Sequence, residues 1–112
     1  MFMRKLILLS ALCAALGGLT LQAADAKENW NKQCAKCHGE DGKGQTTMGK
    51  KLKVGDYTDP KVQEKFTDEE AIKITKEGKK EGSKTLMKGY SDLFSDQEIK
   101  DLVAYIRKMA KK

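Results

Sequence analysis

The sequence predicts a small all-α domain built from three to five short helices. Three observations lead to this fold class. An apolar stripe with helical spacing lies near the C-terminus, two capping-box motifs mark helix starts, and no stretch shows a strand pattern of comparable strength. We therefore expect short helices joined by glycine-rich loops.

The first 26 residues have the layout of a secretory signal peptide. Residues 4–5 are basic, residues 6–16 are apolar except for one serine, and an A-x-A pattern ends at Ala26. We expect cleavage between Ala23 and Ala26. A membrane anchor is the alternative, but the apolar run is short for a transmembrane span. Residues 27–112 then form the mature domain, with a net charge of +5 against +6 for the whole chain.

Helix signals divide this domain in order. A first helix is expected over 27–37, and the glycine-rich stretch 39–55 is expected to be an irregular loop. The pair Asp59-Pro60 starts a short helical segment near 61–65. Two capping boxes, Thr67 with Glu70 and Ser95 with Glu98, then start helices that run to about Glu77 and Met109. The last helix carries the apolar stripe Ile99, Leu102, Val103, Ile106 and Met109.

The stretch CAKCH, residues 34–38, holds the only histidine of the chain and the only cysteines outside the first 13 residues. A disulfide between Cys34 and Cys37 would close a very small loop and constrain little. A thioredoxin-like pair needs a βαβ setting, for which no strands are predicted. A structural zinc site needs about four ligands, and this stretch supplies at most three. The pattern C-x-x-C-H is instead the attachment signature of haem c, in which both thiols form thioethers and His38 binds the iron.

Three segments carry a resemblance to a known family: CAKCHGEDGKG, TLMKGY and FSDQEIKDLVAYIR. They resemble the class I monohaem cytochromes c, especially the small bacterial c6/c555-like cytochromes. The resemblance covers essentially the whole of residues 27–112 and implies the class I cytochrome c fold, with the helices wrapped around one covalently bound haem. The family commonly has a proline soon after the motif, whose carbonyl accepts the imidazole N–H. Here the only proline is Pro60, so we expect another carbonyl, in the 42–52 loop, to orient His38.

The sixth ligand of the iron has several candidates. No second histidine exists, and methionine favours the reduced iron. Met109 continues the apolar stripe and is better explained as core. Met48 lies in the loop after the motif and is the runner-up. Met87 lies in a loop between Gly82 and Gly89, where the family places its ligand, and we assign it as the distal ligand on that resemblance.

Other residues are expected to surround the haem. Trp30 lies one turn before Cys34 and should pack where the first helix crosses the last, against Leu102, Tyr105 or Ile106. Tyr57 and Tyr90 are candidates for hydrogen bonds to the haem propionates. The pocket wall is expected to include Leu52, Ile72, Ile74, Leu86, Leu93 and Phe94.

These residues predict a soluble electron carrier rather than an enzyme: a monomeric, periplasmic c-type cytochrome of a respiratory or photosynthetic-type chain. The alternatives are a five-coordinate haem protein that binds a gas or peroxide, and a redox subunit docked in a larger oxidoreductase. Redox partners with acidic surfaces are expected, because lysines gather in the two loops around the haem edge. These are Lys43, Lys50, Lys51, Lys53, Lys84 and Lys88. Nucleic-acid binding and a membrane span after cleavage are not expected.

Overall fold

The computed structural model describes residues 25–111 of the 112-residue chain. Its first helical stretch is continuous over 25–38. Within it, η1 (Trp30–Cys34) is a π-helical turn, and α2 (Ala35–His38) carries the rest of the motif. The wide turn is closed by the Ala35 N–H, which donates to the Trp30 carbonyl five residues earlier. The predicted first helix is therefore present, and its π-helical turn ends at Cys34, the first residue of the motif.

Both predicted capping boxes are present. The helices α5 (Asp68–Glu77) and α6 (Asp96–Lys108) begin after Thr67 and Ser95, whose hydroxyls accept from the N–H groups of Glu70 and Glu98. The short helix α4 (Pro60–Gln63) begins with its proline after Asp59, as predicted. The glycine-rich stretch was expected to be irregular, and this was wrong for α3 (Thr47–Leu52). Thr46 caps α3, because its side chain accepts from the Gly49 N–H. A threonine in this place is a helix-start signal, but the many glycines of the stretch favoured a loop in the prediction.

A β-hairpin is the main departure from the predicted secondary structure. Strands β1 (Gly78–Glu81) and β2 (Lys84–Lys88) pair antiparallel, with Met87 opposite Lys79 and an irregularity between Lys79 and Lys80. The turn between the strands is Gly82-Ser83, and Gly82 has a φ of +62°. A two-residue Gly-Ser turn is a hairpin signal, but its flanks are lysine-rich and do not alternate, so the strands were missed.

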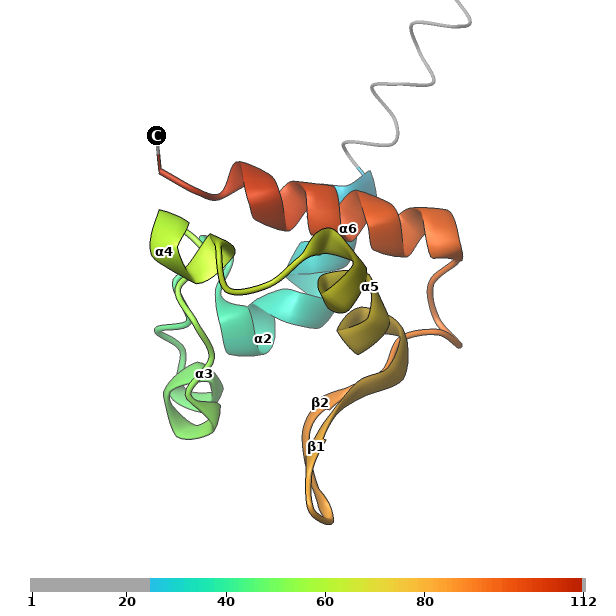
Figure 1. Ribbon diagram of the computed structural model, residues 1–112, viewed down its shortest axis with the longest axis horizontal. Coiled ribbons are helices and arrows are strands. Elements are labelled where there is room, and N and C mark those ends of the chain that lie inside the picture. The colour runs from blue at the N-terminus through green and yellow to red at the C-terminus, as the bar shows by residue number, and fades with distance from the viewer. Residues whose placement is uncertain (1–24, 112) are drawn as a thin grey trace, which may run out of the picture.

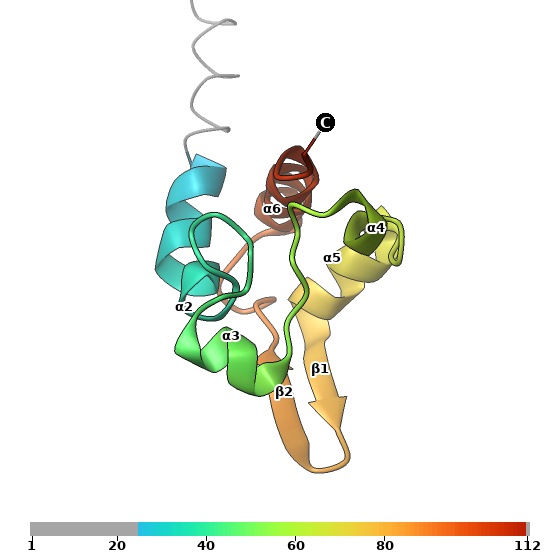
Figure 2. The ribbon, with the colours of Figure 1, turned by 90° about the vertical axis from the view of Figure 1, so that its left-hand side faces the viewer.

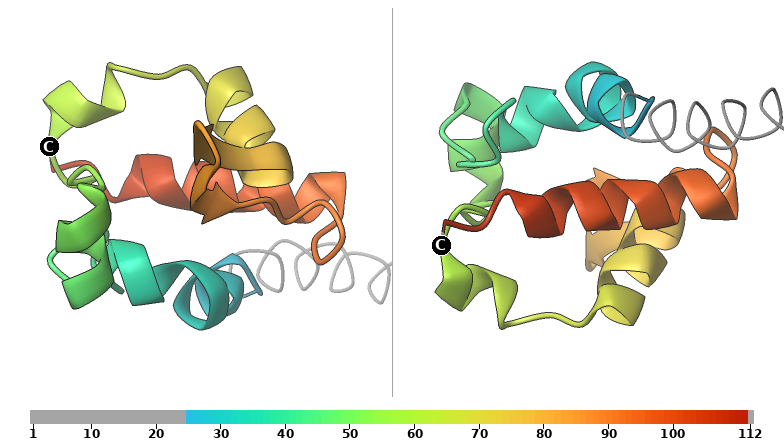
Figure 3. Two further views of the ribbon diagram at one scale, coloured as in Figure 1. Left: turned by 90° about the horizontal axis from the view of Figure 1, so that it is seen from below. Right: turned by 90° about the horizontal axis from the view of Figure 1, so that it is seen from above.

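The helices surround one apolar core. Figure 3 shows α6 across the middle, with the first helical stretch and α3 on one side and α4 and α5 on the other. The hairpin and α3 lie on the side of the molecule away from α6 (Figures 1 and 2). The buried side chains, hereafter the central cluster, are Trp30, Cys34, Tyr90, Phe94, Ile99, Leu102 and Ile106. Trp30 is 1% exposed and its ring lies 5.9 Å from that of Tyr105, as predicted for the crossing of the first and last helices.

One polar network ties α6 to the α4 end of the molecule. The Arg107 guanidinium donates to the backbone carbonyls of Gln63 and Phe66, to the Gln63 side chain and to Asp68. The buried Gln63 amide in turn donates to the carbonyls of Tyr57 and Ile106. These bonds fix the segment 57–68 against the last helix. Among residues 25–111, no helix is long and apolar enough to cross a membrane.

Candidate metal centre

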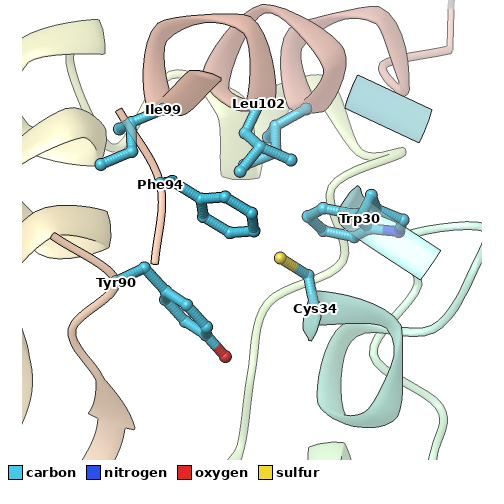
Figure 4. Close-up of a cluster of buried hydrophobic side chains, with 7 residues drawn as sticks. Trp30, Cys34, Tyr90, Phe94, Ile99 and Leu102 are labelled. Carbon is cyan, nitrogen blue, oxygen red and sulfur yellow. The ribbon is translucent and has the colours of Figure 1, made fainter. Parts of the chain in front are cut away.

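The motif lies at the end of the first helical stretch. Both cysteines carry free thiols, Cys34 buried and Cys37 half-buried. The Cys34 sulfur points toward the space between Trp30, Phe94 and Tyr90 (Figure 4). Burial raises the pKa of the Cys34 thiol to about 12, with a smaller contribution from Cys37. Cys34 is therefore an uncharged thiol at neutral pH, set in the apolar core rather than on the surface.

The segment after the motif satisfies the carbonyl groups of its helical end. The Gly44 N–H donates to the His38 carbonyl over 2.8 Å, and the Thr46 hydroxyl donates to the Cys37 carbonyl over 2.6 Å. Gly49 packs so closely against that same Cys37 carbonyl that a side chain would not fit. The end of a helix leaves carbonyls without partners, and these contacts supply them. The position of the motif is thus set by residues 44–49.

The His38 ring is held between aromatic rings. It stacks on Tyr57 with 5.2 Å between ring centroids and 22° between planes, and the Trp30 ring lies 5.5 Å away on a tilted plane. Burial lowers the pKa of His38, which favours the neutral imidazole that a metal ligand requires. Its Nδ1 is buried and has no hydrogen-bond partner. The expected carbonyl from the 42–52 loop is therefore not bonded to it, because the loop turns its polar groups to the motif's backbone instead.

The three methionines of the described chain differ in their surroundings. Met87, on β2, is half-buried and packs against the central cluster, which includes Cys34. Met109, just past the end of α6, also packs there, consistent with its interpretation as core. Met48, on α3, is 37% exposed. Of the two candidate distal ligands, the structure brings Met87 into the cluster around the motif.

The donor set fits a covalently attached haem. Two free thiols three residues apart suit two thioether links, and a neutral imidazole follows the second thiol directly. Met87, which carries a thioether sulfur, packs against the central cluster, to which Cys34 belongs. Among residues 25–111, no three His, Cys, Asp or Glu side chains are grouped so as to hold a bare metal ion. The site therefore offers the two axial ligands that a haem iron needs, and not the complete set of side-chain ligands that a bare metal ion would need.

Several neighbouring residues make contacts that their positions in the sequence did not predict. Tyr57, a candidate propionate partner, stacks on His38, and the Tyr90 hydroxyl donates to the Gln33 carbonyl over 3.1 Å. Of the expected wall residues, Phe94 is buried and Ile72 packs on the central cluster, whereas Ile74 and Leu93 are 36% and 53% exposed. Periodicity and loop position signalled only that these residues are near the site. Which ring meets which depends on the tertiary fold.

Comparisons with known proteins agree with this site. The family model described as "Cytochrome c" matches residues 23–110. Among solved structures, the chain is similar to the KustC0563 c-type cytochrome, with a TM-score of 0.66 and 28% sequence identity. That similarity covers 77% of this chain and 98% of the other. No curated protein matches the sequence.

Proposed function

Because this chain belongs to the cytochrome c family, which binds covalent haem c and transfers electrons, we propose that it is a soluble, monomeric carrier of single electrons. We place it in the periplasm, between redox partners of a respiratory or photosynthetic-type chain. The proposal is supported by the surroundings of the motif: Cys34 belongs to the central cluster, and Met87 packs against that cluster. His38, which follows Cys37, lies between the rings of Trp30 and Tyr57.

Each of these residues has one role in the proposal. Haem c, when bound, supplies an iron that alternates between its ferrous and ferric states. Cys34 and Cys37 would hold the macrocycle through thioethers, and His38 would be the proximal ligand. Met87 would be the distal ligand, and its soft thioether would favour the ferrous state. With His38 and Met87 both bound to the iron, the chain would leave no open position for substrate chemistry.

The central cluster contributes by excluding water. Trp30, Ile99 and Leu102 are at most 1% exposed, and Phe94 and Tyr90 lie beside Cys34 (Figure 4). A dry, apolar surrounding disfavours extra charge on the iron and so favours the reduced form. It also keeps the residues around the site in one arrangement, which suits electron transfer because little has to move between oxidation states.

We propose that partners dock through acidic surfaces. Support comes from the lysines on the side away from α6: Lys50, Lys51 and Lys53 in and after α3, and Lys79, Lys80, Lys84 and Lys88 on the hairpin, all exposed. Complementary charge raises the rate of encounter more than it raises affinity. The hairpin would thus present both Met87, near the central cluster, and a positively charged surface.

The test is acid–acetone extraction followed by visible spectra of the oxidised and reduced protein. We expect the haem to stay with the polypeptide, the spectra of low-spin six-coordinate iron in both states, and no reaction with carbon monoxide. Release of haem would exclude the thioethers. Carbon monoxide binding would favour the gas-binding or peroxidatic alternative, and co-elution with a larger oxidoreductase on gel filtration of a native extract would favour a docked subunit.

A further inference from the structure

The feature left unexplained by this proposal is the unpartnered Nδ1 of His38. It is a buried nitrogen with no acceptor. A histidine that binds a metal almost always donates its other ring N–H to a carbonyl, carboxylate or water, which fixes the ring plane and makes the ligand more basic. Since Nδ1 is enclosed by protein, we assign Nε2 to the iron. Something other than a hydrogen bond must then orient this ring.

Four carbonyl groups in and after the motif already accept a hydrogen bond from another donor. The carbonyl of Cys37 accepts from Thr46 and that of His38 accepts from Gly44. The Gly39 carbonyl accepts from the Trp30 indole over 3.0 Å, and the Gly42 carbonyl accepts from the Tyr57 N–H over 2.8 Å. These carbonyl oxygens therefore accept from the loop itself, through Gly44 and Thr46, and from the two aromatic residues that flank His38.

Those two aromatic residues are themselves fixed. The Trp30 ring is 1% exposed and is anchored by its bond to Gly39, the residue after His38. Tyr57 is held at both backbone groups, because its N–H donates to Gly42 and its carbonyl accepts from the buried Gln63 amide. Phe66 packs edge-on against Tyr57 at 5.9 Å. These contacts fix the position of the Tyr57 ring that stacks on His38.

We propose that Tyr57 is the positioning residue for the proximal ligand, with the Trp30 ring as the second aromatic contact. Stacking on these rings, and not a hydrogen bond, sets the plane of the His38 imidazole. The proposal rests on His38 being the proximal ligand. An imidazole without an acceptor at Nδ1 is a weaker electron donor, so this arrangement also favours the ferrous state and raises the reduction potential.

The first test uses the unmutated holoprotein and exploits the single histidine. Selective ¹⁵N-histidine labelling gives signals from His38 alone. In the reduced protein we expect one Nδ1–H that exchanges slowly with solvent and has the chemical shift of a ring N–H without an acceptor. A shift typical of a strong hydrogen bond would overturn the proposal, whatever the variants do.

The second test replaces the Tyr57 ring. Tyr57→Phe keeps the ring and should keep the wild-type haem-methyl NMR pattern of the ferric protein, which reports the plane of the axial ligand. Tyr57→Leu should change that pattern, lower the reduction potential, because water then reaches Nδ1, and speed Nδ1–H exchange roughly tenfold or more. Phe66→Leu is the matched control: it removes a ring that packs on Tyr57 but keeps both backbone hydrogen bonds that hold Tyr57, so it should lower stability without changing the pattern.

Two results would overturn the role of Tyr57. One is a Tyr57→Leu protein with the haem-methyl pattern and potential of the wild type. The other is a Tyr57→Phe protein that changes as much as Tyr57→Leu, since the hydroxyl rather than the ring would then be responsible. Failure of the proposed function looks different: His38 signals unaffected by the oxidation state of the iron would mean that His38 is not the ligand at all.

Discussion

The three methionines of the described chain differ in how well their surroundings suit a distal iron ligand. A thioether in an apolar cluster can be held near an iron without competition from water, whereas an exposed one is solvated and mobile. Met87 meets the first condition and Met48, at 37% exposure on α3, meets the second. Met109 is half-buried like Met87 and also packs against the central cluster, but it lies beside Gly42, just after the C-terminal end of α6. This separation makes the distal ligand a question that single substitutions can answer.

Met87→Ala should remove the distal ligand. We expect the reduction potential to fall, because the thioether stabilises ferrous iron. The weak far-red absorption band of a methionine–ferric iron bond should disappear, and carbon monoxide should bind readily. Visible spectra and a potentiometric titration of the purified variant measure all three effects.

The controls are the other two methionines. Met48→Ala and Met109→Ala should keep the far-red band, and Met109→Ala should also lower the thermal midpoint because Met109 packs on the central cluster. If the band survives in Met87→Ala but is lost in Met48→Ala, the ligand comes from α3 and the assignment is wrong.

At the scale of single elements, the hairpin positions Met87 by joining it rigidly to α5. Gly78, directly after α5, has a φ of +84° and lies so close to the backbone of residues 87–89 that no side chain would fit there. The Tyr90 N–H then donates to the Thr75 carbonyl over 2.8 Å, so the chain leaving β2 is bonded back to α5. Met87 is therefore not on a free loop: its strand pairs with β1, and the end of the strand that follows Met87 is bonded back to the capped helix α5.

The capping boxes themselves can be tested. Ser95→Ala removes the hydroxyl that accepts from the Glu98 N–H at the start of α6. Loss of such a cap costs about 1 kcal/mol, so the free energy of unfolding should fall by this amount in chemical denaturation. Ser95 is exposed and lies outside the central cluster, and the three cluster residues on α6 are unaltered, so the absorption spectrum of the folded protein should remain unchanged.

Ser95→Asp is the matched control, because an aspartate at this position can accept the same bond and should restore most of the stability. Equal losses in Ser95→Ala and Ser95→Asp would mean that the hydroxyl's other contacts, not the cap, are responsible. The equivalent change on α5, Thr67→Ala, should have a similar effect.

At the scale of the whole molecule, charge is distributed unevenly. The hairpin and α3 carry seven exposed lysines of the described chain, including the residue that follows α3. Both elements lie on the side opposite α6 (Figures 1 and 2). A one-sided positive surface steers an acidic partner toward one face, and its effect decreases with ionic strength.

Electron transfer to an acidic partner should therefore slow as salt is added, because the screening length shortens from ~10 Å at 0.1 M to ~3 Å at 1 M. Lys84→Glu, on the hairpin, should lower the low-salt rate more than Lys100→Glu, which makes the same charge change on α6. Stopped-flow kinetics measure both. Equal effects of the two substitutions, or rates that do not vary with salt, would show that the lysines only keep the surface solvated.

The N-terminal boundary is a further property of the whole chain. The signal-peptide prediction rests on residues 1–26, most of which lie outside the described residues. Ala26 is 5% exposed and residues 25–29 are helical. We therefore expect cleavage at the early end of the predicted range, after Ala23 or Ala24, so that Ala26 stays in the domain. N-terminal sequencing of exported protein decides this, and a mature protein that begins at Met1 in the membrane fraction would refute it.

The amino-acid sequence by itself indicated the haem-attachment chemistry and the capped helices. The C-x-x-C-H spacing and the two capping boxes are relations between residues at most four positions apart, so they can be read without knowing the fold. The apolar stripe of α6 is likewise local, and its Ile99, Leu102, Val103 and Ile106 are buried. The contact of Trp30 with the last helix was predicted from its place one turn before Cys34 and from the family resemblance, and it is confirmed.

Only the tertiary structure decided that Met87, rather than Met48, packs against the central cluster, and which ring faces His38. Met87 lies 49 residues after His38 and Tyr57 lies 19 residues after it, and no local pattern specifies which distant segments meet. The hairpin escaped prediction because its strands are held by pairing and by the end of α5 rather than by an alternating apolar face. The unpartnered Nδ1 follows from the same cause: it depends on where every neighbouring carbonyl finds its own donor, and that is settled only when the whole chain is folded.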